Sequence, residues 1–256
     1  MASVTLRFYE ELNDFLPGTL RKRDIDWESQ PGESLKHLIE AVGVPHTEVE
    51  VVLVNGRSVG LDCQLQAGDR ISVYPMFESL DVTPLLRLRA KPLRQPKFIA
   101  DAHLGKLARY LRLLGFDTLF FNDLGDQRLI QLSIGEARTL LTRDRALLMH
   151  RLLTHGGYLH HVDAKRQLAE VVARYDLCRM IQPFSRCMVC NGLIVSQKKV
   201  QIEQRLPAQV ASRHEQFWCC RNCQKIYWKG SHYDQLLKTI AAICGKKTDD
   251  IARILD

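Results

Sequence analysis

Four cysteines in the last third of the chain have the spacing of a metal site. Cys187 and Cys190 form one Cys-x-x-Cys pair, and Cys220 and Cys223 form a second pair after 29 intervening residues. Two such pairs supply the four thiolates of a tetrahedral structural zinc site. Because every ligand is a cysteine, water and substrate have no coordination position. The spacing predicts a zinc ribbon, against the alternatives of coincidental pairs or a redox dithiol.

The other cysteines lack this spacing. Cys219 lies beside Cys220 but breaks the two-residue interval, so we expect it not to bind the metal. Cys63, Cys178 and Cys244 are predicted to be small buried or half-buried thiols, because disulfides are rare in a reducing compartment.

Three aspartates follow predicted strands. Asp101 comes after strand 98–100, Asp126 after strand 118–121 and Asp144 after strand 139–142. The carboxyl ends of parallel strands meet at one edge of a sheet, and gathered carboxylates repel one another unless a cation lies among them. Mg²⁺ or Mn²⁺ with carboxylate ligands can hydrolyse phosphodiesters. Asp126 and Asp144 are equally well explained as helix N-caps, and Asp123 and Asp163 are weaker candidates for a fourth acid.

Basic side chains accompany these acids. The predicted helix 104–114 buries leucines and turns out Lys106, Arg109 and Arg112, while Arg143 and Arg145 flank the third aspartate. A basic row can bind an RNA backbone, although a solvated helix face has the same pattern.

Aromatic residues surround the second cysteine pair. Trp228, Lys229 and His232 could bind RNA through stacking and phosphate contacts. The alternative is that Trp218, Tyr227 and Trp228 form the small core of the ribbon.

Charge is unevenly distributed along the chain. Residues 1–80 hold 7 Lys/Arg and 13 Asp/Glu, a net charge of −6, whereas the remaining residues hold 29 basic and 16 acidic side chains, a net charge of +13. The second part of the chain therefore attracts a polyanion such as RNA. The chain has no segment of about 18 apolar residues and no signal peptide, so we expect a cytoplasmic protein without membrane contact.

The elements that position these residues suggest three domains. Residues 1–80 combine strands 4–8, 51–54 and 70–75 with helix 34–42, which is typical of a ubiquitin-like β-grasp. Residues 81–96 are a basic, proline-containing linker, either a solvated connector or a source of phosphate contacts. Residues 97–180 alternate strands with helices, which predicts a parallel α/β sheet. In this part we also expect helices from 127, at 146–153 and at 166–175, and a strand at 158–162. Residues 181–256 are the zinc ribbon and a C-terminal helix.

Two resemblances complete these predictions. Residues 54–57 and 68–75 resemble small sulfur-carrier proteins of the β-grasp fold, but the terminal Gly-Gly of those carriers is absent, so carrier chemistry is not expected. The stretches Lys97 to Asp117, Leu141 to Arg145, Arg186 to Gly192 and Tyr227 to His232 resemble the Mut-seven C-terminal RNase family, which is similar to PIN-type nucleases with an appended zinc ribbon. Bacterial members often carry a ubiquitin-like domain in front.

This resemblance implies a PIN-like, metal-dependent ribonuclease with structural zinc and catalytic Mg²⁺ or Mn²⁺. Its acids fall on Asp101, Asp126 and Asp144, and the fourth acid typical of PIN domains has no clear match, although Asp163 is one candidate. The alternative is a non-catalytic RNA-binding protein associated with tRNA or the ribosome. The first domain is expected to contact a protein partner or to cover the active site through its opposite charge.

Overall fold

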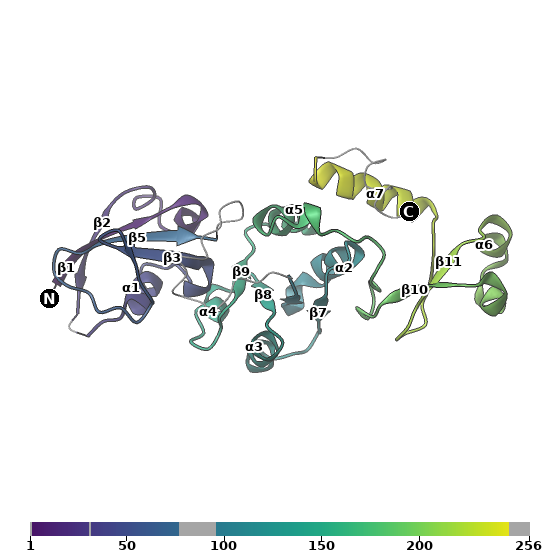
Figure 1. Cartoon of the computed structure of the whole chain (residues 1–256), viewed down its shortest axis with the longest axis horizontal. Helices are drawn as coiled ribbons and strands as arrows, with labels where there is room; N and C mark the ends of the chain where they lie inside the picture. The colour runs from purple at the N-terminus through teal and green to yellow at the C-terminus, as the bar shows by residue number, and fades with distance from the viewer. Residues whose placement is uncertain (1, 31, 77–95, 246–256) are drawn as a thin grey trace. The chain divides into compact units, whose positions relative to one another are not determined.

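The computed structural model describes residues 2–30, 32–76 and 96–245 (Figure 1). Its contacts define two compact units, one formed by Met1–Gln95 with Leu124–His160 and the other by Pro96–Asp123 with His161–Asp256. The predicted linker 81–96 lies outside the described residues except for Pro96. No helix among the described residues is long and apolar enough to cross a membrane.

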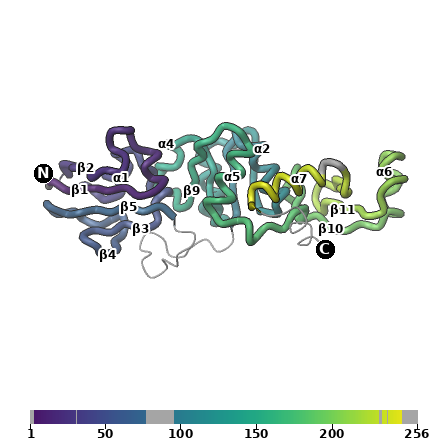
Figure 2. Tube along the Cα trace, turned by 90° about the horizontal axis from the view of Figure 1, so that it is seen from above, coloured from purple at the N-terminus to yellow at the C-terminus, as the bar shows by residue number. Residues whose placement is uncertain are grey.

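A five-stranded sheet forms the beginning of the first unit. Its strand order is β2-β1-β5-β3-β4, with β1 parallel to β5 and the other pairs antiparallel. Helix α1 (Leu35–Ala41) fully buries Leu35, Leu38 and Ile39 in the core of this domain. Figures 1 and 2 show the strands, β1 (Ala2–Phe8), β2 (Ile25–Ser29), β3 (Val49–Val54), β4 (Arg57–Ser58) and β5 (Arg70–Pro75). This topology confirms the predicted β-grasp.

Two local sequence signals set the ends of these elements. Ser34 is the N-cap of α1, and its side chain accepts a hydrogen bond from the backbone N–H of His37, as predicted. Asn55 and Gly56, with φ of 50° and 79°, form the tight turn between β3 and β4. A two-residue turn with positive φ at both positions matches the twist of a hairpin, which explains the Asn-Gly pair.

Residues 124–160 continue the first unit and pack on the β-grasp domain. They form α3 (Asp126–Gly135), β8 (Thr139–Thr142), α4 (Arg145–Leu148) and β9 (Gly156–Tyr158), and β8 is parallel to β9. Thr47 Oγ1 donates a hydrogen bond to the Leu148 carbonyl at 3.2 Å. The Tyr158 N–H donates to Glu48 Oε1 at 2.6 Å. The short helix η2 (His46–Glu48) thus fastens α4 and β9 to the β-grasp domain.

Two predicted elements of this region are wrong in extent. The helix expected over 146–153 ends at Leu148, and the strand expected over 158–162 is instead Gly156–Tyr158. The strand begins on Gly156, which two side chains approach closely. A Cβ on Gly156 would lie 2.5 Å from Leu148 Cδ2 and 3.1 Å from Thr47 Oγ1. Hydrophobic periodicity does not detect this strand, because its first two residues are glycines without side chains.

His46 makes the first unit sensitive to acid. Its Nδ1 lies 2.6 Å from Glu40 Oε1 and its Nε2 lies 2.8 Å from the Leu153 carbonyl oxygen. Burial lowers the pKa of His46 below its ordinary value of 6.5, and the charge of Lys36 lowers it further, while the bonds to Leu153 and Glu40 oppose the shift. The unfolded chain therefore binds a proton more readily than the folded chain does between these two pKa values.

We expect the contribution of His46 to the stability of the first unit to be complete above pH 6.5 and to be lost progressively as the pH falls through the lower pKa of folded His46. Hydrogen exchange of residues 35–54 at pH 7.5, 6.5 and 5.5 measures this loss. The His46→Gln variant should show a weaker pH dependence, because glutamine is neutral throughout. Equal pH dependence in both proteins would contradict the prediction.

The second unit contains the remaining α/β elements. Strands β6 (Phe98–Ala100) and β7 (Thr118–Phe120) are parallel and are joined by η4 (Ala102–Leu104) and α2 (Gly105–Leu113). Helix α5 (Ala164–Arg174) packs beside α2. Leu107 and Leu111 of α2 are buried, so the apolar face predicted for this helix is confirmed, and Leu168 of α5 is buried as well.

A three-stranded antiparallel sheet forms the ribbon. Its strand order is β10-β11-β12, and Phe217 is a buried aromatic side chain of this sheet, with 1% of its surface exposed. The elements of this part are β10 (Ile194–Gln197), α6 (Ala208–Arg213), β11 (Phe217–Cys220), β12 (Ile226–Trp228) and α7 (Ser231–Ile243).

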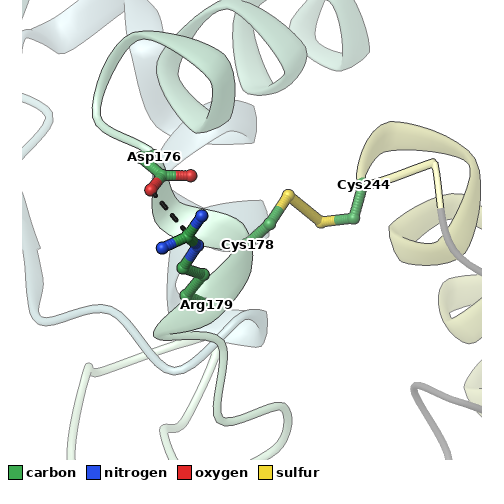
Figure 3. The surroundings of a disulfide bond; sticks show 4 residues. All are labelled: Asp176, Cys178, Arg179 and Cys244. Atoms are coloured by element: carbon green, nitrogen blue, oxygen red, sulfur yellow. Dashed lines mark ion pairs between the residues drawn. A yellow bond between two sulfur atoms is a disulfide. The ribbon is translucent and has the colours of Figure 1, made fainter. Parts of the chain in front are cut away.

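A disulfide joins Cys178 and Cys244, which corrects the prediction that both are free thiols (Figure 3). Cys178 lies in η5 (Leu177–Arg179) and Cys244 caps the end of α7. Their Cα atoms are 5.7 Å apart although 66 residues separate them in the chain. No local spacing in the sequence predicts this disulfide, because only the packing of α7 brings the two cysteines together. Cys63 is unpaired and half-buried, as expected.

Candidate functional site

The four cysteines of the two predicted pairs converge on one point of the ribbon. Their sulfur atoms all lie within 4.8 Å of one another, with Cys187 3.5 Å from Cys223 and Cys190 3.4 Å from Cys220. Sulfur ligands about 2.3 Å from zinc form a tetrahedron with edges of about 3.8 Å, so the arrangement fits that ion. Among the residues that the structure describes, no other cysteine, histidine or acidic group of three or more is as compact. The cluster can therefore hold a metal ion such as zinc.

Two similar turns present these sulfurs. The N–H of Asn191 donates to the carbonyl of Cys187, and the N–H of Gln224 donates to the carbonyl of Cys220. Asn191 and Gln224 both adopt left-handed φ, at 66° and 59°, directly after the second cysteine of each pair. Gly192 allows the two turns to approach, since a Cβ there would lie 2.8 Å from the side chain of Asn222.

The pKa values of the cysteines indicate that the four thiols cannot all ionise without a bound cation. Burial raises the pKa of Cys223 to about 12, and hydrogen bonding with Cys190, Cys187 and Cys220 adds to the shift. Burial also acts to raise the pKa of Cys187, but hydrogen bonds from the Tyr227 hydroxyl and from backbone N–H groups outweigh it and lower that pKa to about 7. Neighbouring thiolates repel one another, so four of them require a positive ion.

Cys219 stays outside the cluster, as predicted. It is buried in β11, and its sulfur lies 3.4 Å from Gln224 Oε1. Alternation along the strand turns Cys219 and the ligand Cys220 to opposite faces of the sheet.

Arg112 corrects the prediction of a basic row that faces solvent. It is only 5% exposed, and its Nε donates to the Thr118 carbonyl at 2.8 Å. Its Nη1 donates to the carbonyls of Met188 and Val189 at 3.2 and 2.8 Å. Burial lowers the pKa of Arg112, and the nearby Cys187 and Cys190 oppose that shift. Arg112 therefore joins α2 to the first cysteine turn.

Helix geometry explains this result. Three residues advance an α-helix by about 300°, so each step of three falls about 60° short of a full turn. From Lys106 to Arg112 the two steps add to about 120°, which carries Arg112 from the exposed face to within about 40° of buried Ala108. Lys106 and Arg109 are exposed, as predicted.

Lys106 and Arg109 lie between two hollows in the second unit. One hollow of about 670 Å³ is lined by His103, Phe120 and the start of α5, with Lys165 adding a third cation. The other, of about 450 Å³, is lined by Leu113, Met188, Val189 and Lys225 of the ribbon. Lys106 and Arg109 line both hollows. This surface combines positive charge with space for an extended anionic ligand.

The three predicted acids are divided between the two units. Asp101 lies in the second unit directly after β6, is half-buried, and accepts a hydrogen bond from the Ala102 N–H at 2.6 Å. Asp126 and Asp144 lie in the first unit, and both are exposed. Within either unit, the described residues include no group of three acidic side chains close enough to share a metal ion.

Helix N-capping explains the positions of some of these aspartates. Asp144 is the N-cap of α4, and its Oδ1 accepts from the N–H groups of Ala146 and Leu147. Asp163 caps α5 in the same way. Asp126 is not an N-cap, because Gly125 occupies that position and Asp126 is the first helical residue.

The arginines beside Asp144 have partners in the first unit. Arg143 Nε donates to the Leu159 carbonyl at 3.3 Å. Arg145 Nη1 donates to the Phe15 carbonyl at 3.3 Å, and its guanidinium carbon lies 5.2 Å from the Phe15 ring centroid and 5.3 Å from that of Tyr158. Arg145 thus helps to hold α4 on the β-grasp domain.

The ribbon residues predicted to bind RNA are partly described. Trp228 is half-buried, and Lys229 is exposed. The side chain of His232 lies outside the described residues.

Two residues support the cysteine cluster although the cysteine spacing does not predict this role. The Tyr227 hydroxyl lies 3.1 Å from Cys187 Sγ. The Asn191 side chain accepts from the Thr118 N–H at 3.1 Å and donates to Asp117 Oδ1 at 2.7 Å. Asn191 directly follows the first cysteine pair, so its position in the sequence could have predicted a role beside the cluster. Nothing in the sequence connects Tyr227 with Cys187.

The fold and this cluster define the class of protein: a ubiquitin-like domain, parallel α/β elements and a cysteine ribbon in one chain. Residues 96–240 match the family model described as Mut7-C RNAse domain, and residues 1–81 match the one described as Mut7-C ubiquitin. The chain belongs to the Mut7-C RNAse domain family, which confirms the resemblance found in the sequence.

Two solved structures are similar to part of the chain. One is described as a putative molybdopterin converting factor, subunit 1, from Pyrococcus furiosus, with 21% identity, a TM-score of 0.25, and coverage of 30% of this chain and 100% of that one. The other is SAMP1 from Haloferax volcanii, with 16% identity, a TM-score of 0.25, and coverage of 31% of this chain and 100% of that one. No curated protein matches the chain.

Proposed function

We propose that the protein is a metal-dependent ribonuclease that hydrolyses RNA phosphodiester bonds. The match of residues 96–240 to the RNAse domain is the observation that carries this proposal. The exposed Lys106 and Arg109 support it, because the hollows beside them can accept the phosphates of an RNA chain.

Asp101, Asp126 and Asp144 are the proposed ligands of Mg²⁺ or Mn²⁺. Their carboxylate oxygens are the donors that these hard cations prefer. The capping bonds of Asp144 use only Oδ1, so its capping role leaves Oδ2 for a cation. When bound, such a cation supplies an activated water and stabilises the leaving oxygen. Within this proposal, Lys106 and Arg109 hold the scissile strand through its phosphates.

Zinc is proposed as the structural ion of the ribbon. Four cysteines, of which Cys187 and Cys220 are 0% exposed, leave no position for substrate. Arg112 connects this ribbon to α2, which carries the proposed RNA-binding cations. The zinc would therefore act on catalysis only through the fold.

A non-catalytic RNA-binding protein is the second candidate. The observation that favours it is the capping role of Asp101 and Asp144, which accounts for both residues without a metal ion. A protein partner of the β-grasp domain stays a prediction.

Incubation of the zinc-loaded chain with end-labelled single-stranded and hairpin RNAs distinguishes these candidates. We expect cleavage after addition of Mg²⁺ or Mn²⁺ and none without them. The divalent ion should be omitted rather than chelated, because a chelator would also strip the cysteine site. Salt-sensitive binding without cleavage at any concentration of either ion would leave the binding protein as the remaining function.

A further inference from the structure

An aromatic hollow opens on the ribbon. Its volume is about 230 Å³, which suits one flat ring system better than a larger ligand. Five aromatic side chains line it together with a lysine and two serines; they are Phe184, Trp218, Tyr227, Trp228, Tyr233, Lys229, Ser185 and Ser196.

Strand register builds the floor of this hollow. Ser196 on β10 pairs with Trp218 on β11, which pairs in turn with Tyr227 on β12. Directly paired residues point to the same face of a sheet, so these three side chains form one row across the ribbon. Phe184 and Tyr233 stack on each other with ring centroids 4.4 Å apart and add a wall from outside the sheet.

These aromatic side chains are not the core of the ribbon. The buried aromatic residue of the sheet is Phe217, which is 1% exposed and pairs with Trp228. Phe184, Trp218, Tyr227, Trp228 and Tyr233 are all half-buried, so each keeps part of its surface open to solvent. Of the two interpretations that the sequence left open, the structure favours an aromatic binding surface over a closed core.

A cation stands beside the rings. Lys229 Nζ lies 5.9 Å from the ring centroid of Trp218 and 5.7 Å from that of Tyr233. The lysine is exposed, so its ammonium group can contact an anion while its stem stays against the rings. An aromatic surface next to an exposed cation provides for both parts of a nucleotide, the base and the phosphate.

We propose that this hollow binds one unstacked base of single-stranded RNA, with Lys229 at the adjoining phosphate. The proposal rests on RNA being the substrate of the proposed ribonuclease. An apolar peptide is the competing occupant, but the net charge of +13 in residues 81–256 favours a polyanion. The hollow would hold the RNA strand on the ribbon, through residues other than the proposed catalytic aspartates.

The test measures binding of a fluorescent 12-nucleotide adenylate RNA to the zinc-loaded full chain, without added Mg²⁺ or Mn²⁺. Trp218→Leu keeps apolar volume but removes the ring face. We expect roughly tenfold weaker binding, the scale for loss of one stacked base. An abasic oligomer of equal length and charge should bind wild type and variant equally, because it has no base to stack.

Further variants distinguish loss of the base site from misfolding of the ribbon. Tyr233→Leu should weaken binding in the same base-dependent way from a different element. Lys229→Met should lower the salt dependence of binding by about one phosphate contact. Val200→Ala is the matched control, because Val200 is 86% exposed and lies outside the hollow. Zinc content reports whether each ribbon is folded.

The outcomes separate this proposal from the ribonuclease proposal. Unchanged RNA affinity in folded Trp218→Leu and Tyr233→Leu proteins would overturn the base site, even if the chain cleaves RNA. Equal losses with the normal and the abasic oligomer would also overturn it. Base-dependent losses in a chain that never cleaves RNA would support the base site while the ribonuclease proposal fails.

Discussion

Asp101→Asn and Asp144→Asn are each expected to reduce RNA cleavage by about a hundredfold or more, the scale for loss of one electrostatic contributor to a transition state. Asparagine removes the negative charge that a divalent cation needs. It also caps a helix about as well as aspartate does. Both aspartates are caps in the structure, so this substitution separates ligation from capping. Initial rates at saturating Mn²⁺ provide the measurement.

The control for these variants is Asp176→Asn. Asp176 is an exposed aspartate of the second unit that pairs with Arg179 at 3.6 Å, and asparagine tolerates its left-handed φ of 42°. We expect this variant to cleave RNA at the wild-type rate. Melting temperatures of all three variants should stay close to wild type. Full activity in folded Asp101→Asn protein would remove the proposed metal site.

Cys220→Ser is expected to abolish binding of the proposed zinc ion and to unfold the ribbon. A serine hydroxyl is not a thiolate at neutral pH, and structural zinc contributes about 10–16 kcal/mol in zinc-finger peptides. Cys220 is fully buried, so the variant also leaves three thiols without their cation. We expect zinc content to fall from one ion per chain toward zero. Residues 187–228 should then lose hydrogen-exchange protection.

The neighbouring cysteine provides a matched control for this substitution. Cys219 is also buried, lies one residue away and is outside the cluster. Cys219→Ser makes the same chemical change, and we expect it to keep one zinc ion per chain. Equal zinc loss in the two variants would mean that burial of the sulfur, rather than ligation, holds the ribbon together.

Local signals predicted the parts of the fold that depend on short stretches of sequence. The cysteine spacing located the cluster, and Ser34 and the Asn55-Gly56 turn marked ends of elements in the β-grasp domain. These features act through neighbouring backbone groups, so the sequence nearby contains the information.

The features that were missed depend on contacts between distant residues. The disulfide joins Cys178 to Cys244 across 66 residues, and Arg112 is buried because carbonyls of residues 188 and 189 receive its guanidinium. The side chains of Thr47, which is distant in sequence, and of Leu148 both approach Gly156 of β9 closely. Periodicity and spacing carry no information about such partners. The roles of the three aspartates stay predictions for the same reason.

The fastening of α4 and β9 to the β-grasp domain bears on how the protein can be shortened. A variant that starts after residue 80 would keep Leu148 and Tyr158 but lose Thr47 and Glu48, which bind their backbone groups. The variant would also lose Phe15, whose carbonyl accepts the hydrogen bond from Arg145, the residue after Asp144. Removal of the ubiquitin-like part would therefore strip away the support of one proposed catalytic aspartate, and an inactive truncation would say nothing about substrate recognition by that part.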